Sequence, residues 1–137
     1  MAQMADIRDL QLLVRHEIGT SKRLKRELNL VEHIPAVDNF SLLLMYSDHL
    51  SDSHLRSISA SMRESDIVMP KGNYIMCLLP GTDKEGAIHL AEGIKDFLGE
   101  EGYYVAVTYP EDGDTYEKLM DSLKLYLENK GATLPFT

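Results

Sequence analysis

The sequence is poor in cysteine, in basic residues and in long apolar runs. Its single cysteine, Cys77, excludes a disulfide framework, and its position in the run YIMCLLP predicts a small buried thiol. The 14 lysines and arginines are outnumbered by 22 acidic residues, which gives a formal net charge of −8 at pH 7. A chain with this charge has no general basic surface to neutralise phosphates, so we do not expect a general nucleic-acid binder.

The absence of long apolar runs also bears on the membrane. No stretch approaches the roughly 18 consecutive apolar residues of a membrane span, and the N-terminus lacks a basic region followed by an apolar core. We therefore expect no membrane association and a cytoplasmic location. The 137 residues, 44% of them hydrophobic, suffice for one domain with a substantial core. Pro35 separates an N-terminal helical segment, residues 1–36, from a domain over residues 37–137.

Residues 2–33 have the apolar spacing of a helix. The apolar residues that recur at intervals of three and four are Ile7, Leu10, Val14, Leu24, Leu28 and Val31. Residues 19–21 are able to end one helix and cap a second, so either one long helix or two abutting helices are expected. The stripe predicts a homodimer whose interface contains Ile7, Leu10 and Val14. The alternative is that the stripe packs on the sheet of its own chain.

The rest of the chain alternates between strand and helix patterns. Strands are expected over residues 39–47, 66–69, 74–80 and 103–110, and helices over residues 51–64, 82–98 and 114–131. Ser51, Thr82 and Asp114 are the expected N-caps, and a turn over residues 70–73 joins the second and third strands. The order β-α-β-β-α-β-α predicts an α+β fold with a ferredoxin-like core, in which helices cover a four-stranded antiparallel sheet.

Few side chains group in a way that suits catalysis or metal binding. Asp48, His49, Asp52 and His54 lie close together in the sequence. Their spacing does not place two histidines on one helical face, and Asp52 is suited to stabilise the first turn of a helix. We therefore expect no metal site and no cofactor.

Four segments occur in an order that is similar to that of a known family. LLLMYSDHL is similar to its first strand, RESDIVMPKG to its hairpin, LLPGTDKEGAIHLAEGI to its middle segment and LMDSLKLYLENKG to its last helix. Through these segments, residues 40–131 resemble a degenerate GGDEF domain. The GGDEF domain is the diguanylate cyclase module of the nucleotide cyclase superfamily, which condenses GTP into cyclic di-GMP on a ferredoxin-like core.

The resemblance implies a chain that has lost the catalytic groups of the family. Catalysis in the family needs Mg²⁺ held by carboxylates. Tyr46 stands where the first carboxylate belongs, and only Asp48 remains of that pair. At Gly72 the hairpin reads GNYIM in place of GGDEF, and the segment before Arg63 is shorter than in the family. The resemblance therefore implies that the chain is not an enzyme.

Arg63 and Asp66 match the Arg-x-x-Asp motif of the family's product-binding site. The resemblance makes these two residues candidates for binding cyclic di-GMP, since a guanidinium suits phosphate or the guanine O6/N7 edge and a carboxylate suits the guanine donors. The simpler alternative is that the two side chains are solvated or pair weakly with each other.

These observations lead to one expected function and two alternatives. We expect a non-catalytic GGDEF-like regulatory or interaction module in signal transduction, which binds a second copy of itself or another signalling protein. The first alternative is a cyclic di-GMP receptor that uses Arg63 and Asp66. The second is a divergent nucleotide-processing enzyme that employs Asp48 and other acidic residues.

Overall fold

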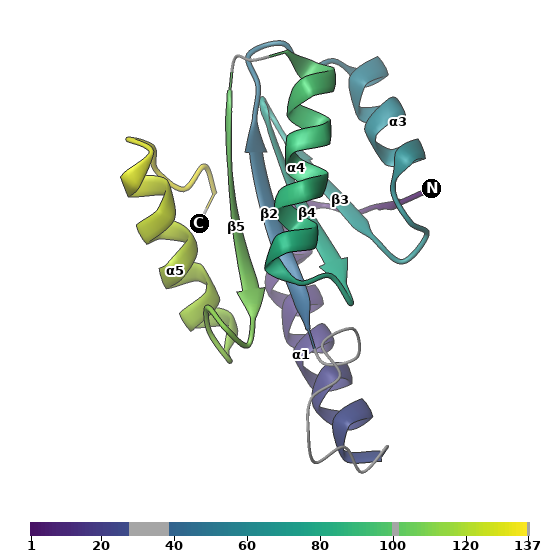
Figure 1. Cartoon of the computed structure of the whole chain (residues 1–137), viewed down its shortest axis with the longest axis vertical. Helices are drawn as coiled ribbons and strands as arrows, with labels where there is room; N and C mark the ends of the chain where they lie inside the picture. Colours follow the sequence, from purple (N-terminus) through teal and green to yellow (C-terminus); the bar gives the residue numbers. More distant parts are fainter. Residues whose placement is uncertain (28–38, 100–101, 137) are drawn as a thin grey trace.

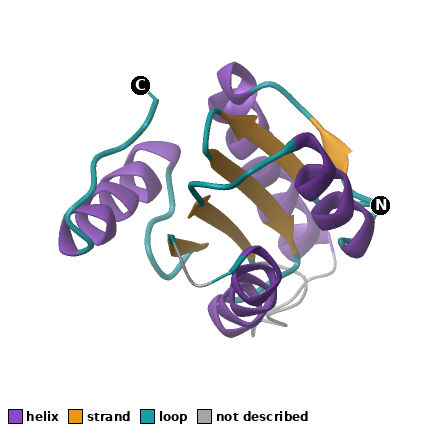
Figure 2. Ribbon diagram, turned by 90° about the horizontal axis from the view of Figure 1, so that it is seen from above, coloured by secondary structure: helices purple, strands orange, loops and turns teal. Residues whose placement is uncertain are grey.

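The computed structural model describes residues 1–27, 39–99 and 102–136, with the side chains of residues 24–27 excepted. One sheet lies between two layers of helices, which gives an α+β fold (Figures 1 and 2). The strands are β1 (Gln3–Met4), β2 (Phe40–Tyr46), β3 (Ile67–Lys71), β4 (Tyr74–Pro80) and β5 (Tyr103–Tyr109). The helices are the 3-10 turn η1 (Ile7–Asp9) and the α-helices α1 (Leu10–Glu27), α3 (Asp52–Ser61), α4 (Lys84–Leu98) and α5 (Tyr116–Asn129).

The sheet is mixed and has five strands in the order β1-β3-β4-β2-β5. Strands β2 to β5 pair antiparallel with one another, whereas β1 runs parallel to β3. The expectation of four antiparallel strands is therefore wrong for the sheet as a whole. The cause is β1, whose two residues are too few to leave a strand pattern in the sequence. Backbone hydrogen bonds hold it, from Gln3 N to Asp66 O at 2.9 Å and from Ala5 N to Val68 O at 3.0 Å.

Strand β2 lies inside the sheet, as its continuous apolar sequence predicts. It pairs with β4 on one side and with β5 on the other. Phe40, Leu42 and Leu44 belong to the core on one face of the sheet, and Leu43 and Met45 belong to the core on the other. All five side chains are buried because helices cover both faces.

The two cores define the two faces of the sheet. On the α1/α5 face, α1 contributes Leu10, Val14 and Ile18, and α5 contributes Leu119, Met120, Leu123 and Leu127. On the α3/α4 face, α3 and the residue after it contribute Ile58 and Met62, and α4 contributes Ala87, Ala91 and Ile94. Figure 1 shows α4 in front of the sheet and α1 behind it.

The N-terminal segment differs from the expectation in two ways. Residues 2–6 are not helical, and α1 then runs through residues 19–21 without a break. Leu10 and Val14 are 2% and 0% exposed in the core of this single chain, and Ile7 packs against the same core. This part of the stripe therefore packs on the sheet of its own chain, which is the alternative that the sequence left open. The side chains of Leu24, Leu28 and Val31 lie outside the described part of the chain.

The helix caps confirm one expectation and correct two. Ser51 caps α3, because its hydroxyl accepts from His54 N at 3.2 Å. Helix α4 is capped by Asp83 and not by Thr82, since the Asp83 carboxylate accepts from Gly86 N at 2.8 Å. Helix α5 is capped by Thr115 and not by Asp114. In each corrected case the cap is the residue directly after the expected one, and both residues are able to accept the same bond.

The β3–β4 hairpin is present, but its turn is tighter than expected. Pro70 and Lys71 belong to β3, which leaves Gly72 and Asn73 as the turn. Gly72 has φ +58°, a conformation that glycine adopts without steric cost. Cys77 on β4 is buried as expected, and burial raises the pKa of its thiol to about 12. Among the described helices, none is long and apolar enough to cross a membrane.

Candidate functional site

The candidate site lies at the end of the sheet where β2 stops and the β3–β4 hairpin turns. Strand register places Tyr46 opposite Tyr74 on β4 and opposite Tyr103 on β5. The ring centroid of Tyr46 lies 5.0 Å from that of Tyr74 and 5.2 Å from that of Tyr103. These distances are typical of interacting aromatic pairs. We call the three residues the tyrosine cluster.

The hydroxyl groups of the tyrosine cluster bond to one another and to Asp48. The Tyr74 and Tyr103 hydroxyl oxygens are 3.0 Å apart, and the Tyr46 hydroxyl donates to the Asp48 carboxylate. The bond to Asp48 raises the pKa of Tyr46, and burial together with the bond to Tyr74 raises that of Tyr103. Both phenols therefore keep their protons at neutral pH. A neutral phenol is a poor substitute for a carboxylate that has to hold Mg²⁺.

The backbone at this end of the sheet is packed tightly. Ser47 N donates to Asn73 O at 3.0 Å, which joins the end of β2 to the hairpin turn. Gly102, just before β5, has φ +137°, and a Cβ at this position would lie 2.2 Å from Tyr46 O. The absence of a side chain at Gly102 thus allows the start of β5 to pass the end of β2.

The histidines and acids that follow β2 do not converge. His54 completes the cap of α3, because its Nδ1 accepts from Ser51 N at 3.2 Å. Asp52 lies in the first turn of the same helix, as expected. Within residues 1–27, 39–99 and 102–136, no three His, Cys, Asp or Glu side chains come close enough to hold a metal ion.

Arg63 and Asp66 lie at the opposite end of β3 from the hairpin and bond to each other. The Arg63 Nη2 donates to Asp66 Oδ1 at 2.9 Å, and Arg63 N donates to Asp66 Oδ2 at 3.0 Å. The same Nη2 also donates to Pro80 O and to Thr82 Oγ1. The Asp66 side chain is only 4% exposed, and both of its oxygens accept bonds from Arg63. The pair thus joins the end of α3 to the end of β4.

The geometry of Asp66 limits what the pair is able to bind. A guanine edge would have to reach a carboxylate that is almost fully buried. The Arg63 side chain is 55% exposed, so part of its guanidinium faces solvent. The arrangement corresponds to the simpler alternative from the sequence, in which the two side chains pair with each other, although Asp66 is more deeply buried than a solvated surface pair.

A second polar group lies at the lower end of the sheet in Figure 1 and was not expected from the sequence. Its centre is Asp112, in the loop between β5 and α5, whose side chain is 7% exposed. Asp112 Oδ2 accepts from Lys84 Nζ at 2.6 Å and from Thr108 N at 2.7 Å, and Oδ1 accepts from the Tyr126 hydroxyl at 2.6 Å. We call Lys84, Asp112 and Tyr126 the Lys84–Asp112 network.

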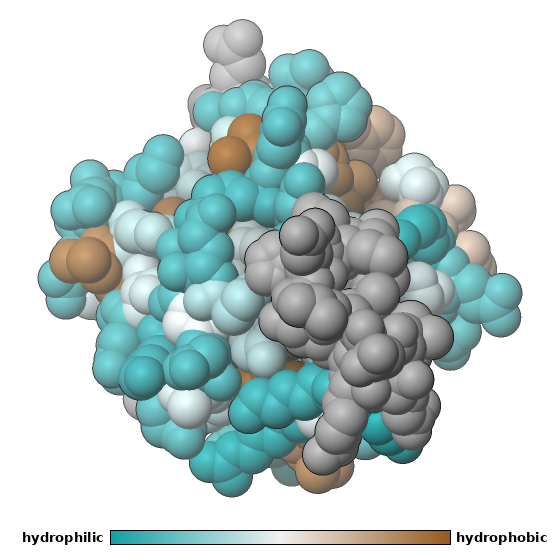
Figure 3. Space-filling view, turned by 60° about the horizontal axis from the view of Figure 1, so that its bottom comes forward, coloured by the Kyte–Doolittle hydropathy of each residue, from teal (hydrophilic) through white to brown (hydrophobic). Residues whose placement is uncertain are grey.

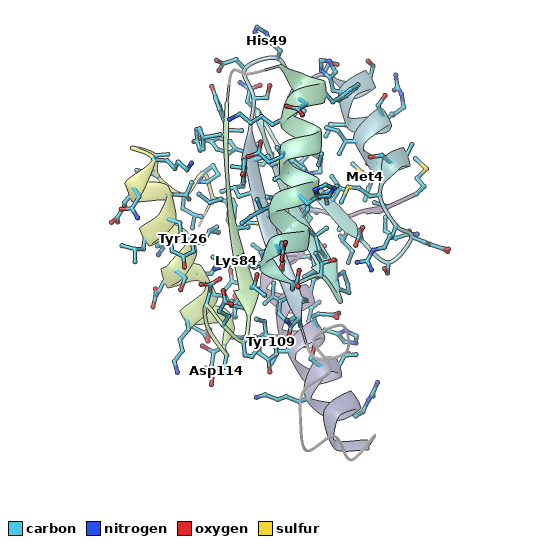
Figure 4. All side chains as sticks on the ribbon, viewed as in Figure 1. Met4, His49, Lys84, Tyr109, Asp114 and Tyr126 are labelled. Atoms are coloured by element: carbon cyan, nitrogen blue, oxygen red, sulfur yellow. The ribbon has the colours of Figure 1, made fainter. Side chains whose placement is uncertain are left out.

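The Lys84–Asp112 network contains a partly buried ion pair, in which the Lys84 side chain is 30% exposed and the Asp112 side chain 7% exposed. Burial alone would raise the pKa of Asp112, but the bonds from Lys84, Tyr126 and Thr108 hold it below its ordinary value. Burial would lower the pKa of Lys84, but Asp112 and Glu111 raise it. Both groups are therefore charged at neutral pH. Lys84 and Tyr126 also lie side by side in Figure 4, with the Lys84 Nζ 5.3 Å from the centre of the Tyr126 ring.

The network joins three segments that are far apart in the sequence. Lys84 begins α4, Asp112 follows β5, and Tyr126 lies on α5. The molecular surface seen from this end is mostly hydrophilic outside the grey atoms (Figure 3). For this loop the sequence predicted only a helix cap at Asp114. No local pattern connects Asp112 with Lys84, so the pairing becomes visible only in the fold.

The chain was compared with protein-family models and with curated proteins. No family model and no curated protein matches it. The resemblance to the GGDEF domain therefore stays a prediction from the sequence motifs.

Proposed function

We propose that the chain is a non-catalytic regulatory or interaction module with a GGDEF-like, ferredoxin-like core. The arrangement of four strands supports the proposed core. Strand β4 lies between β2 and β3, the two strands that α3 connects, and β5 pairs with the other edge of β2. A split β-α-β arrangement of this kind is characteristic of ferredoxin-like folds. Strand β1 is then an addition at the β3 edge.

The observation that carries the proposal is the tyrosine cluster. The sequence resemblance assigns the metal-binding carboxylates to the end of β2 and to the hairpin. At this end the side chains that meet are Tyr46, Tyr74 and Tyr103, and the remaining acid, Asp48, accepts a bond from Tyr46. Transfer of a phosphoryl group from GTP depends on Mg²⁺ to bridge and neutralise the phosphates. One carboxylate beside three tyrosine side chains offers little for this purpose.

The two alternative functions receive less support from the geometry. A cyclic di-GMP receptor needs an accessible Asp66, and this carboxylate is buried and bonded to Arg63. A divergent enzyme that employs Asp48 needs further acids near it, and within the described chain no group of three potential metal ligands forms. Both alternatives remain outcomes of the experiment below.

The experiment has two parts and uses the whole chain. Incubation with GTP and Mg²⁺ or Mn²⁺ should yield no cyclic di-GMP above a control without protein, while an active diguanylate cyclase in the same buffer yields product. Calorimetry with cyclic di-GMP and with GTP should give no heat of binding. Product in the first part would overturn the proposal in favour of an enzyme. Heat with cyclic di-GMP that Arg63→Ala abolishes would favour the receptor.

A further inference from the structure

An open groove separates the two helices on the α3/α4 face. It encloses about 400 Å³, and Ile58 of α3 and Ile94 of α4 lie at its base. Ser57 and Ser61 line it from α3, and Gly93 and Phe97 line it from α4. Figures 1 and 2 show these two helices as neighbours on one side of the sheet. The lining residues of each helix are four positions apart, so the groove follows one face of each helix.

Gly93 is not needed for the packing of its own chain. It lies inside α4, where glycine is less favourable than alanine because it loses more backbone freedom on folding. A Cβ at this position would meet no atom within 4 Å. The described chain thus leaves open space beside a bare stretch of helix, where a second backbone is able to approach closely.

Phe97 is the large apolar side chain at one end of the groove. It is 53% exposed, and its ring meets that of His54 of α3 edge-on, with centroids 5.7 Å apart. Aromatic side chains with this exposure are enriched at the centres of protein interfaces, because they bury a large area at little entropic cost.

The charge of the groove differs from that of the chain. The formal net charge is −8, yet the residues that line the groove include no aspartate and no glutamate. His89 is the only lining residue with an ionisable side chain. Depletion of charge at the centre and polar residues at the rim are typical of surfaces that bind other proteins.

We propose that this groove binds a second copy of the same chain, with α4 packed antiparallel against α4 of the partner about Gly93. Phe97 and His89 lie four residues on either side of Gly93, so this packing places Phe97 of one chain beside His89 of the other. Phe97 then enters the partner's groove, and the close approach of the helices takes place at the two glycines.

A second copy fits better than an unrelated protein because the surface complements itself. A two-fold interface needs a protruding group and its recess on the same patch, and Phe97 and the open space beside Gly93 are such a pair. The lining of the groove includes no aspartate and no glutamate, so packing two such grooves together brings no carboxylates into contact at the centre of the interface, although each chain has a formal net charge of −8.

This interface does not depend on the proposed function. It lies on α3 and α4, and neither the tyrosine cluster nor Arg63 lines it. The experiments that test it contain no nucleotide. A failure here would leave the absence of cyclase activity untouched, and the detection of cyclase activity would leave the interface untouched.

The first test measures the mass of the chain in solution by light scattering at increasing concentration. The unmodified chain should be a dimer at high micromolar concentration, and Phe97→Asp should weaken the dimer by at least about 30-fold while the circular dichroism spectrum is unchanged. Leu125→Asp is the matched control, because Leu125 is 54% exposed on α5, on the other face of the sheet. This control should leave the dimer intact.

The second test uses an introduced cysteine. The native thiol of Cys77 is fully buried, so it does not compete for oxidation. Under mild oxidation Gly93→Cys should form a disulfide between two chains, since the proposed two-fold axis passes near this position, whereas Leu125→Cys should not. A monomeric unmodified chain at high micromolar concentration would overturn the proposal. A dimer that withstands Phe97→Asp, or one that Leu125→Asp alone dissociates, would overturn it as well.

Discussion

The two faces of the sheet are covered to different degrees. On the α1/α5 face the helical side chains that point inward are almost fully buried, and Val14, Leu119 and Leu123 have no exposed surface. On the α3/α4 face, α4 contacts the sheet partly through small side chains, those of Ala87 and Ala91, and a groove remains between α3 and α4. We call the first face the closed face, although a cavity of about 350 Å³ lies at its edge beside Ile7 and Tyr116, and we call the second the open face.

The sequence had suggested the opposite arrangement, in which a second chain binds the N-terminal helix. The most regular apolar stripe, that of the N-terminal helix, was expected to meet a second chain, yet its described residues lie in the closed core. The sequence did not predict the groove on α4, because one glycine and one phenylalanine, Gly93 and Phe97, do not form a periodic pattern. Periodicity identifies the buried side of a helix, but the identity of the surface that covers it depends on the fold.

The largest effect should come from a charge placed on the closed face. Val14→Asp puts a carboxylate at a position with no exposed surface, among the apolar side chains of the core. We expect a loss of about 4 kcal/mol or more in the free energy of unfolding, measured by urea denaturation. The control is Leu12→Asp on the same helix, where the side chain is 70% exposed and the change should cost less than about 0.5 kcal/mol.

The comparison of the two variants also decides how α1 is used. If Val14→Asp gave a folded monomer of normal stability from a dimeric parent, α1 would be an interface and not part of the core. An equal loss in both variants would show that the helix as a whole, and not its buried side, responds to the added charge.

The next effect concerns the network that joins both faces. Asp112→Asn keeps the shape of the side chain but removes the charge that Lys84, Tyr126 and Thr108 contact. We expect a loss of about 2 kcal/mol, because Lys84 keeps Glu111 at 3.0 Å and some contact with water. Asp114→Asn is the control. Its carboxylate is exposed and pairs with the exposed Lys118, so the free energy of unfolding should hardly change.

The same residue predicts the acid dependence of stability. The pKa of Asp112 in the folded chain lies below the ordinary value of 3.8. A lowered pKa stabilises the folded state above the unfolded pKa, and this contribution disappears as the pH falls through the folded value. The difference in stability between the unmodified chain and Asp112→Asn should therefore be constant near neutral pH and shrink below about pH 4. A difference that grows on acidification would contradict this assignment.

A smaller effect is expected at Arg63. Its removal by Arg63→Ala leaves the buried Asp66 carboxylate with the backbone N–H of residue 63 but without the guanidinium. Because the Arg63 side chain is 55% exposed, we expect a cost of about 1 kcal/mol in thermal or urea denaturation. Arg63→Lys should recover only part of it, since the contacts to Asp66, Pro80 and Thr82 all come from Nη2, and the shorter lysine side chain does not place its Nζ at the same point. Unchanged stability in both variants would contradict a structural role.

The local features of the chain were largely predictable from the sequence. The antiparallel hairpin, the buried β2, the cap at Ser51 and the buried Cys77 each depend on a few neighbouring residues whose preferences are strong. The caps of α4 and α5 were displaced by one residue, because Thr82 and Asp83 are both able to cap, as are Asp114 and Thr115. Such competition is decided by backbone geometry, which the sequence specifies only to within a residue or two.

Features that join distant segments were not predictable. Strand β1 forms by pairing with the edge of β3. It has only two residues, which are too few to show a strand periodicity in the sequence. The Lys84–Asp112 network needs α4, β5 and α5 to be in place before its charges meet. The contacts of the Tyr46 ring with the rings of Tyr74 and Tyr103 depend on a strand register that the sequence does not reveal. The roles that the sequence suggested for Tyr46, Asp48, Arg63 and Asp66 therefore stay predictions, and the fold defines only which side chains these residues contact.

The smallest effect concerns the open face, and it tests whether the space beside Gly93 belongs to the chain itself. Gly93→Ala should raise the free energy of unfolding by about 0.5–1 kcal/mol, because alanine favours the helix and the added methyl group meets nothing within 4 Å. The measurement is made at low protein concentration, where dissociated chains dominate. Gly86→Ala in the same helix is the control, since its Cβ would lie 3.1 Å from Thr82 Cγ2 and 3.2 Å from Asp83 Oδ1 and should bring a smaller gain. If Gly93→Ala instead destabilised the dissociated chain, the space beside it would be filled within the chain, and the contrast between a closed and an open face would not hold.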